Sequence, residues 1–327
     1  MRGRNAAARA PASEPRIPGR QVGSVGGPGP ILVAVGGLHG NEPSGLKAVR
    51  RVLRRLRDEE IPLRGRFVAL AGNLGALAQG RRCLGRDLNR LWMEEALSHP
   101  GIPADVPERR DLEELNGALE NLFADGREVT LVDLHSTSGP SPPFACVRDT
   151  RASRAFVRGL PVPLVLGLEE VLRGTLLAWF LDRGGAAGMV FEGGRHRDAA
   201  TVERAESAVW LSLVSAGLLE ARRCPGFARH ASRLRAAARG APRVIEVRHR
   251  HPVAPGDGFR MRRGFRGFQP VRKGEPLARD DRGEIHSPLR GFLLFPLYQA
   301  QGDDGFFVAT RVRSRARRHA APARGRR

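Results

Sequence analysis

The sequence predicts an α/β fold with a mixed, mostly parallel sheet flanked by helices, followed by a small C-terminal all-β domain. Short apolar runs, typical of strands buried on both faces, alternate with segments whose apolar residues recur every three or four positions. This alternation is typical of βαβ units and a parallel sheet. After Arg243 the helical period disappears, and glycine and proline separate short strand-like pieces, which indicates the all-β domain.

The α/β part is predicted to begin with a strand over residues 31–35, an Ile-Leu-Val-Ala-Val run bounded by a proline and two glycines. Residues 44–57 carry apolar side chains at helical spacing and are predicted to form an amphipathic helix. The same criteria predict strands at 66–71, 129–134, 162–166 and 188–191, helices at 108–123 and 201–219, and a terminal helix plus linker within 222–243. Strands of the β domain are predicted at 244–247, 267–271 and 291–297.

These patterns divide the chain into five parts. Residues 1–20 and 311–327 are rich in Arg and Ala and are predicted to be disordered basic arms. Between the arms we expect an α/β domain over 21–225, a linker over 226–243 and the small β domain over 244–310.

Composition excludes several classes of protein. The chain has 327 residues and is 41% hydrophobic, which is enough for a core and argues against wholesale disorder. Its three cysteines are too few and too scattered for a disulfide framework, which favours a reducing compartment. No apolar run approaches the roughly 18 residues that a membrane span needs, and the first 20 residues lack the apolar core of a secretory signal. We therefore expect a cytoplasmic protein with no membrane partner.

The formal net charge is +21, from 55 Lys+Arg and 34 Asp+Glu, which raises the question of a nucleic-acid partner. Residues 1–20 contribute +4 and residues 311–327 contribute +8, so the two arms hold 12 of the 21 charges. Only two basic residues are lysines, which indicates a compositional bias toward arginine. Aromatic residues make up 6% of the chain, so stacking platforms for bases are few. A basic-arm binder of nucleic acid or of an anionic surface is the alternative function, not the main expectation.

The strongest chemical signal is a Gly-Gly-Leu-His-Gly-Asn-Glu-Pro segment directly after the first predicted strand, at the sheet edge where α/β folds bind ligands. His39 and Glu42 are three residues apart on a loop that enters a helix, so both side chains can reach one metal ion. His135 ends another apolar strand, and two His with one Glu is a ligand set of catalytic zinc sites. A single loop histidine is more often a surface residue, so the combination carries the prediction. Asp133 is either an acceptor for a ligand histidine or a turn residue.

Two further segments carry side chains suited to amide chemistry. Arg90, beside the amide of Asn89, presents a planar fork that can bind a carboxylate, and Arg82 can stabilise an oxyanion. In a chain this rich in arginine, spacing alone does not decide these two roles. Glu192 ends an apolar strand and is followed by two glycines, so it is either a general base acting on a metal-activated water or a solvent-facing strand terminus.

Taken in order, these motifs resemble the succinylglutamate desuccinylase/aspartoacylase family, a branch of the zinc-carboxypeptidase-like hydrolases. The β-rich segments 268–278 and 285–291 also fit, so the resemblance covers roughly residues 20–310. Each motif is weak alone, whereas the ordered set is specific. The matching motifs are His-Gly-Asn-Glu at 39–42, Gly-Asn at 72–73, Arg82, Asp-Leu-Asn-Arg at 87–90, Asp-Leu-His-Ser-Thr at 133–137 and Glu-Gly-Gly at 192–194.

The resemblance implies a zinc-carboxypeptidase-like fold and a zinc-dependent amidohydrolase, or deacylase. Its substrate would be the linear amide of an N-acyl amino acid or of a similar small carboxylate. Residue by residue, the resemblance implies one zinc ion per chain held by His39, Glu42 and His135, proton transfer by Glu192, oxyanion stabilisation by Arg82, and carboxylate binding by Asn89 and Arg90.

Two departures from the family leave the substrate open. Aspartoacylases place a second substrate-binding arginine about ten residues before the catalytic glutamate, where this chain has Asp182 with Arg183 beside it. They also use a tyrosine of the C-terminal domain, near whose expected position this chain has Asp304, a glycine and Phe306. The acyl group, the amino acid and the oligomeric state, a homo-oligomer included, are therefore not predicted. A non-catalytic binding module of the same fold is disfavoured because every motif residue is present.

Overall fold

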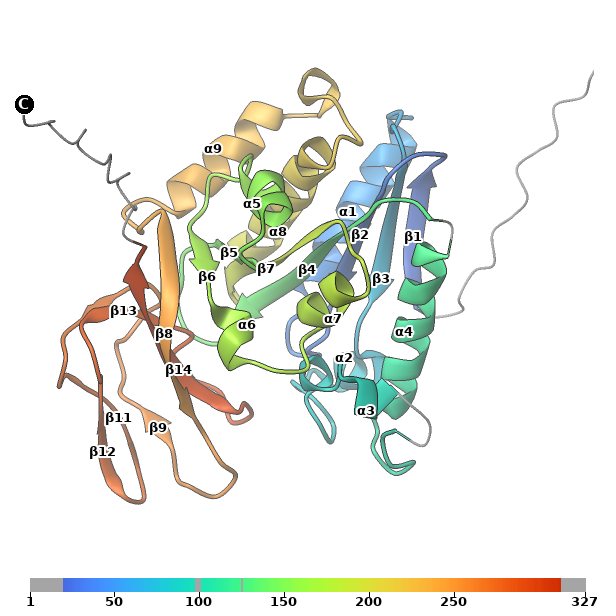
Figure 1. The fold of residues 1–327 in the computed structure, drawn as a ribbon. Coiled ribbons are helices and arrows are strands. Elements are labelled where there is room, and N and C mark those ends of the chain that lie inside the picture. The colour runs from blue at the N-terminus through green and yellow to red at the C-terminus, as the bar shows by residue number, and fades with distance from the viewer. Residues whose placement is uncertain (1–19, 98–100, 125, 313–327) are drawn as a thin grey trace, which may run out of the picture.

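The computed structural model describes residues 20–97, 101–124 and 126–312 (Figure 1). The strands of the α/β part are β1 (Gln21–Gly26), β2 (Ile31–Gly36), β3 (Arg66–Ala71), β4 (Val129–Thr137), β5 (Phe144–Cys146), β6 (Leu164–Leu166) and β7 (Ala187–Arg195). Those of the C-terminal part are β8 (Val244–Pro252), β9 (Arg260–Met261), β10 (Pro270–Val271), β11 (Pro276–Asp280), β12 (Gly283–His286), β13 (Gly291–Leu294) and β14 (Asp304–Arg311).

Helices alternate with the strands in the first part of the chain. Within the described ranges, no helix is both long enough and apolar enough to cross a membrane. The helices are α1 (Ser44–Asp58), α2 (Leu74–Gln79), α3 (Glu94–Leu97), α4 (Arg109–Phe123), α5 (Arg151–Val157), α6 (Leu168–Val171), α7 (Leu176–Asp182), α8 (Ala199–Ser215) and α9 (Phe227–Ala237), with the 3-10 turns η1 (Leu88–Arg90) and η2 (Ala221–Arg223).

One large sheet connects the two parts of the chain. In the described residues its strand order is β1-β3-β2-β4-β7-β5-β6-β8-β14-β13-β10, and a smaller sheet has the order β12-β11-β9. Neighbouring pairs among β3, β2, β4 and β7 are parallel. Apolar side chains of α1 and α8 form a core on one face of these strands, and those of α4 and α7 form a core on the other (Figure 1). Because both faces are covered, the central strands are largely apolar up to their carboxyl ends, and every residue of β2 is buried.

The C-terminal part is built from strands, which confirms the predicted change from α/β to all-β structure. Beyond Ala237 the described residues contain strands and no helix. β8 joins the large sheet beside β6 with parallel pairing, and β14 and β13 continue it with antiparallel pairing. The segment between β13 and β14 therefore returns to the edge of the α/β part. The domain boundary itself stays a prediction.

Most predicted elements are present, with shifted ends. The strand predicted at 129–134 continues to Thr137, and the one predicted at 188–191 runs to Arg195. The predicted helix 201–219 begins at Ala199, where Asp198 caps it by accepting the Ala200 amide, and ends before Gly217, which has a left-handed φ of 74°. Other elements are shorter than predicted, with β6 within the predicted 162–166, α9 within 222–243, β10 within 267–271 and β13 within 291–297. The strand predicted at 244–247 extends as β8 to Pro252, and β1, α7 and β14 are among the elements that were not predicted.

The predicted arms lie almost entirely outside the described residues. Arg20 and Arg311, the residues of the arms that border the folded part, are ordered and packed instead of disordered. Arg20 is fully buried, and its guanidinium lies 2.6 Å from Asp111 and 3.0 Å from Glu114. Arg311 closes β14 opposite Ile245 of β8. Composition could not reveal these two positions, because the partners of each residue are distant in the sequence.

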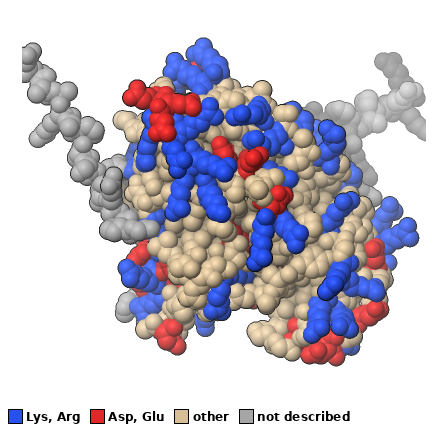
Figure 2. All heavy atoms as spheres, turned by 180° about the vertical axis from the view of Figure 1, so that it is seen from behind, with Lys and Arg blue, Asp and Glu red and all other residues tan. Residues whose placement is uncertain are grey.

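The described surface is basic but not uniformly so. Figure 2 shows Lys and Arg side chains over much of the face seen from behind, with Asp and Glu side chains between them. Some charged side chains of the described surface pair with each other, as do Arg51 with Glu206 at 3.4 Å and Arg55 with Glu59 at 2.6 Å. Exposed pairs of this kind add little to stability, but they place negative charges among the positive ones.

Candidate active site

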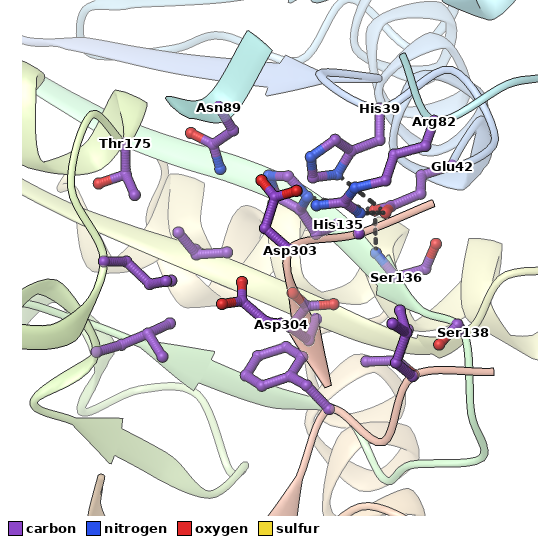
Figure 3. A pocket seen from close by; sticks show the side chains of 18 of the residues that line it. His39, Glu42, Arg82, Asn89, His135, Ser136, Ser138, Thr175, Asp303 and Asp304 are labelled. Atoms are coloured by element: carbon purple, nitrogen blue, oxygen red, sulfur yellow. Dashed lines mark hydrogen bonds and ion pairs between the residues drawn. The ribbon is translucent and has the colours of Figure 1, made fainter. Parts of the chain in front are cut away.

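The site residues expected from the sequence meet in one cavity at the carboxyl ends of the parallel strands (Figure 3). His39 and Glu42 follow β2, His135 lies near the end of β4, and Glu192 lies opposite His135 in the β4–β7 register.

The segment between β13 and β14 forms another side of the cavity through Leu297, Gln299 and Asp303, among others. The cavity also receives Arg82, Asn89 and Arg90.

Close backbone packing explains the glycine between the first two candidate ligands. A Cβ atom on Gly40 would lie 2.0 Å from the carbonyl carbon of Ala76, which is an interior residue of α2. Only glycine allows this approach, which holds the loop of His39 against α2. Glu42 lies immediately before Pro43, the residue that precedes α1, so the helix start fixes its position.

Three buried side chains form a compact donor cluster. The Nδ1 atom of His39 lies 3.0 Å from Oε1 of Glu42, and Nδ1 of His135 lies 3.2 Å from Oε2 of the same carboxylate. One ligand atom from each residue lies within 4.8 Å of the others. The backbone amide of Ser136 donates to Glu42 Oε2 at 2.8 Å, which holds the carboxylate in place.

Two outer carboxylates orient the histidine rings. His39 Nε2 lies 3.0 Å from Oδ1 of Asp87, and His135 Nε2 lies 2.9 Å from Oδ2 of Asp133. An imidazole that donates Nε2–H to a carboxylate presents the lone pair of Nδ1 to the opposite side, which here is the centre of the cluster. Of the two roles considered for Asp133, the structure supports the acceptor. Asp87, which had no predicted role, acts in the same way on His39.

The donor chemistry of the cluster fits a divalent cation. Burial alone would lower the pKa of His135, but the carboxylates of Asp133 and Glu42 hold it well above its usual value. Burial likewise favours neutral Glu42, yet the two histidines hold its pKa well below its usual value. Both histidine rings thus have carboxylates at both nitrogens, an arrangement that a bound cation satisfies by replacing the inner protons. Two imidazole nitrogens and one carboxylate are ligands that zinc accepts.

Arg82 is held beside the cluster by Asp87. Its Nη2 and Nε atoms donate to Asp87 Oδ2 at 2.7 and 3.2 Å. Its Nη1 atom lies 3.6 Å from Glu42 Oε1 (Figure 3). Burial works against the charge, but Asp87 and Glu42 raise the pKa of the guanidinium, so Arg82 stays cationic. A single carboxylate therefore positions both a candidate metal ligand and a fixed positive charge.

Glu192 has the features of a group that exchanges protons. It is buried, and its Oε2 atom has no hydrogen-bond partner among the described residues. Burial raises the pKa of Glu192 to about 8; the negative charges of Glu42 and Asp133 add to this, and His135 opposes it. A cation at the cluster would favour the carboxylate form. A buried carboxyl with a raised pKa in a cavity is a candidate general base.

The predicted carboxylate-binding pair is partly occupied by the chain itself. Asn89 accepts the backbone amide of Leu176 at 2.8 Å through Oδ1, which leaves its amide nitrogen as the end available to a ligand (Figure 3). Arg90 donates from Nη1 to the Asn89 carbonyl and from Nη2 to Asp304 Oδ2, each at 2.8 Å. Asp304 also accepts from Arg250. Because these two atoms already donate, the fork is not fully free as the sequence suggested, and only its buried Nε atom has no partner among the described residues.

Sequence reasoning missed several residues of the cavity wall. His196 lies between Ser136 Oγ at 2.9 Å and Gln299 Oε1 at 3.1 Å, and Gln299 also accepts from Asn41. The position of His196 just after the Glu-Gly-Gly motif was a usable signal. For Gln299 there was none, because it reaches the site from more than a hundred residues further along the chain.

Comparison with known proteins places these features in a family. The model of the succinylglutamate desuccinylase/aspartoacylase catalytic domain matches residues 28–211. A succinylglutamate desuccinylase of Shewanella putrefaciens is 31% identical over 133 residues, which are 39% of this chain and 38% of that protein. An N-acyl-aromatic-L-amino acid amidohydrolase of Danio rerio is 31% identical over 112 residues, which are 33% of this chain and 34% of that protein. The chain thus matches well under half the length of these curated relatives.

Solved structures share the fold over most of the chain. A succinylglutamate desuccinylase/aspartoacylase from Rhodobacter sphaeroides superposes with a TM-score of 0.61 at 21% identity, covering 88% of each chain. Murine aminoacylase 3 superposes with a TM-score of 0.60 at 19% identity, covering 88% of this chain and 96% of that one. These likenesses show the fold, and the family model covers more than half of the residues. The chain therefore belongs to the succinylglutamate desuccinylase/aspartoacylase family.

Proposed function

We propose that this chain is a zinc-dependent amidohydrolase that cleaves the linear amide of an N-acyl amino acid or of a similar small carboxylate. The observation that carries this proposal is the meeting of the buried cluster His39, Glu42 and His135 with Arg82 and Glu192 in one cavity. The names of relatives, a succinylglutamate desuccinylase and an N-acyl-aromatic-L-amino acid amidohydrolase, support the choice of an amide substrate.

One zinc ion per chain would be held by the two Nδ1 atoms of His39 and His135 and by the Glu42 carboxylate. Bound there, zinc supplies Lewis acidity toward the amide carbonyl and lowers the pKa of a water molecule. The outer carboxylates Asp87 and Asp133 keep both rings in the tautomer that such binding needs.

The remaining chemistry is assigned to side chains of this protein. Hydrolysis adds one water across the amide: the C–N bond breaks, the acyl carbon becomes a carboxylate, and the nitrogen gains both protons of that water and leaves as an ammonium. Glu192 takes a proton from the attacking water, in the carboxylate form that a cation at the cluster favours, and delivers it to the leaving nitrogen. Arg82, fixed by Asp87, supplies positive charge to the developing oxyanion. The Asn89 amide and the Arg90 Nε atom orient a substrate carboxylate.

The test combines metal analysis with a substrate panel. Protein that has been reloaded with zinc and desalted is expected to contain about one zinc per chain by elemental mass spectrometry. It should release free amine from at least one N-acetyl, N-succinyl or other N-acyl amino acid, lose this activity with a chelator and regain it with zinc. Protein that holds no stoichiometric metal after reloading would refute the zinc assignment, and failure on the whole panel would refute the substrate class.

A further inference from the structure

One carboxylate in the cavity has no part in the proposed hydrolysis. Glu169 lies on α6 and lines the same cavity as Glu192. Most of the neighbouring wall is apolar, with Thr175 as a polar member, and we call Glu169 together with the apolar residues the distal end of the cavity. The apolar members are Leu168, Leu172, Leu177, Val190, Phe295 and Phe307.

The distal end contains an uncompensated negative charge. At the other end, Arg82 pairs with Asp87, and Arg90 pairs with Asp304. Glu169, in contrast, has no ion pair with any described residue. Arg148, the cation that influences Glu169, donates its short hydrogen bond to Asp182 instead, at 2.6 Å.

Apart from one backbone hydrogen bond, this carboxylate has no partner among the described residues that compensates its burial. Burial raises the pKa of Glu169 to about 7; Arg148 opposes this shift, whereas Glu170 and Asp149 add to it. A half-buried carboxylate beside apolar side chains is stabilised by a ligand that brings a positive charge or a hydrogen-bond donor.

The arginine that aspartoacylases use for a second substrate carboxylate has no counterpart in this cavity. Asp182 is largely exposed and pairs with Arg148, and Arg183 pairs with Glu120 at 2.9 Å on the surface. Neither residue lines the cavity. The distal end therefore presents a carboxylate and apolar wall rather than a cation to whatever part of the substrate reaches it.

We infer that the distal end binds a positively charged group of the substrate, an ammonium carried on a short methylene chain, through the Glu169 carboxylate. The apolar wall covers the methylene groups, as it would cover those of a lysine-like side chain. This inference rests on the proposed function, since the same cavity holds the scissile amide. It sets the chain apart from enzymes that take N-succinyl or N-acylaspartyl substrates, because the second carboxylate of such substrates would face Glu169 instead of a cation.

The test uses ligands that differ only in their terminal group. One series varies the amino-acid side chain in Nα-acetyl-L-ornithine, Nα-acetyl-L-norleucine and Nα-acetyl-L-glutamate. A second series varies the acyl group on L-alanine as 4-aminobutanoyl, pentanoyl and succinyl. Zinc-loaded protein is titrated with each ligand by calorimetry, and kcat/KM is measured in parallel, so binding is observed whether or not turnover occurs.

The matched variants are Glu169→Gln and Glu170→Gln. Both remove one charge from α6, but Glu170 is exposed and does not line the cavity. In one of the two series the ammonium ligand should bind about tenfold or more tightly than the methyl ligand, as expected for a hydrogen bond between charged groups. Glu169→Gln should abolish this preference, and Glu170→Gln should change it less than about twofold. Melting temperatures confirm that both variants are folded.

The outcomes separate this inference from the proposed function. An ammonium preference that depends on Glu169, in the absence of any hydrolysis, would support the cation site and count against the amidohydrolase. Hydrolysis with no ammonium preference in either series would overturn the cation site alone. A preference that survives Glu169→Gln, or that Glu170→Gln removes equally, would also overturn it.

Discussion

The two ends of the cavity differ in how their polar groups are satisfied. At the metal-cluster end, His39, Glu42 and His135 contact one another, and Asp87 and Asp133 hold the outer nitrogens of the rings. At the distal end, Glu169 has no ion pair within the described residues and lies beside apolar side chains. The first end is preorganised by the chain, whereas the second needs a ligand to complete it. This difference is what one expects if the first performs the chemistry and the second selects the substrate.

The largest effect should come from breaking the preorganised end. His39→Ala and His135→Ala each remove a donor and leave Glu42 without one of its partners. We expect loss of stoichiometric zinc, measured by elemental mass spectrometry, and a loss of activity of about a thousandfold or more. His286→Ala, which removes an exposed histidine of β12, is the matched control and should keep its zinc. A His39→Ala or His135→Ala variant with a full zinc complement would remove that residue from the ligand set.

The next effect separates metal binding from proton transfer. Glu192→Gln keeps the size of the side chain but cannot accept a proton, and Glu192 is not part of the donor cluster. Zinc content should stay near that of the wild type, while kcat falls by about 10²–10⁴-fold. An unchanged kcat would exclude Glu192 as the general base. Loss of zinc together with activity would instead indicate a structural role at the cluster.

A smaller effect tests whether preorganisation itself matters. Asp87→Asn keeps the shape of a residue that positions both His39 and Arg82 but removes its charge. We expect zinc affinity or kcat to fall about 10–100-fold, as for other carboxylates behind metal ligands. Chelator titration and steady-state kinetics measure the two quantities. Wild-type values for both would mean that Asp87 orients neither residue.

The smallest effect concerns the basic C-terminal segment. The side chains assigned to hydrolysis all lie between His39 and Glu192, and Glu169 of the distal end lies between them as well. Removing 313–327 should therefore change kcat/KM by less than about twofold, in an assay at moderate ionic strength. A large loss of activity would show that this segment takes part in substrate binding, and the role of its positive charge would have to be reconsidered.

Much of the fold follows from local sequence patterns. The apolar run of β2 and the helical spacing in α1 and α4 are repeated short-range signals, and burial of a strand or helix face is their direct consequence. Shorter elements such as β5 and α6 were not predicted, because three or four residues carry too little pattern. Tertiary packing, not propensity, holds such elements in place.

The residues of the metal cluster could also be predicted from the sequence, because of where parallel strands end. Parallel strands end at a common edge, so a histidine or glutamate after each apolar run is brought to one place by the topology alone. That reasoning, with the family resemblance, selected the three clustered residues His39, Glu42 and His135, together with Glu192 in the same cavity.

The sequence by itself thus determined the fold class, the family and the residues at the strand ends, because these depend on short-range patterns and ordered motifs. Only the tertiary structure decided that Asp87 joins His39 to Arg82, that Asp304 engages Arg90 from 214 residues away, and that Glu169 lines the cavity without an ion pair to any described residue. A cavity wall is assembled from segments that are far apart in the chain. Its charge balance is therefore set by packing, which no local pattern encodes.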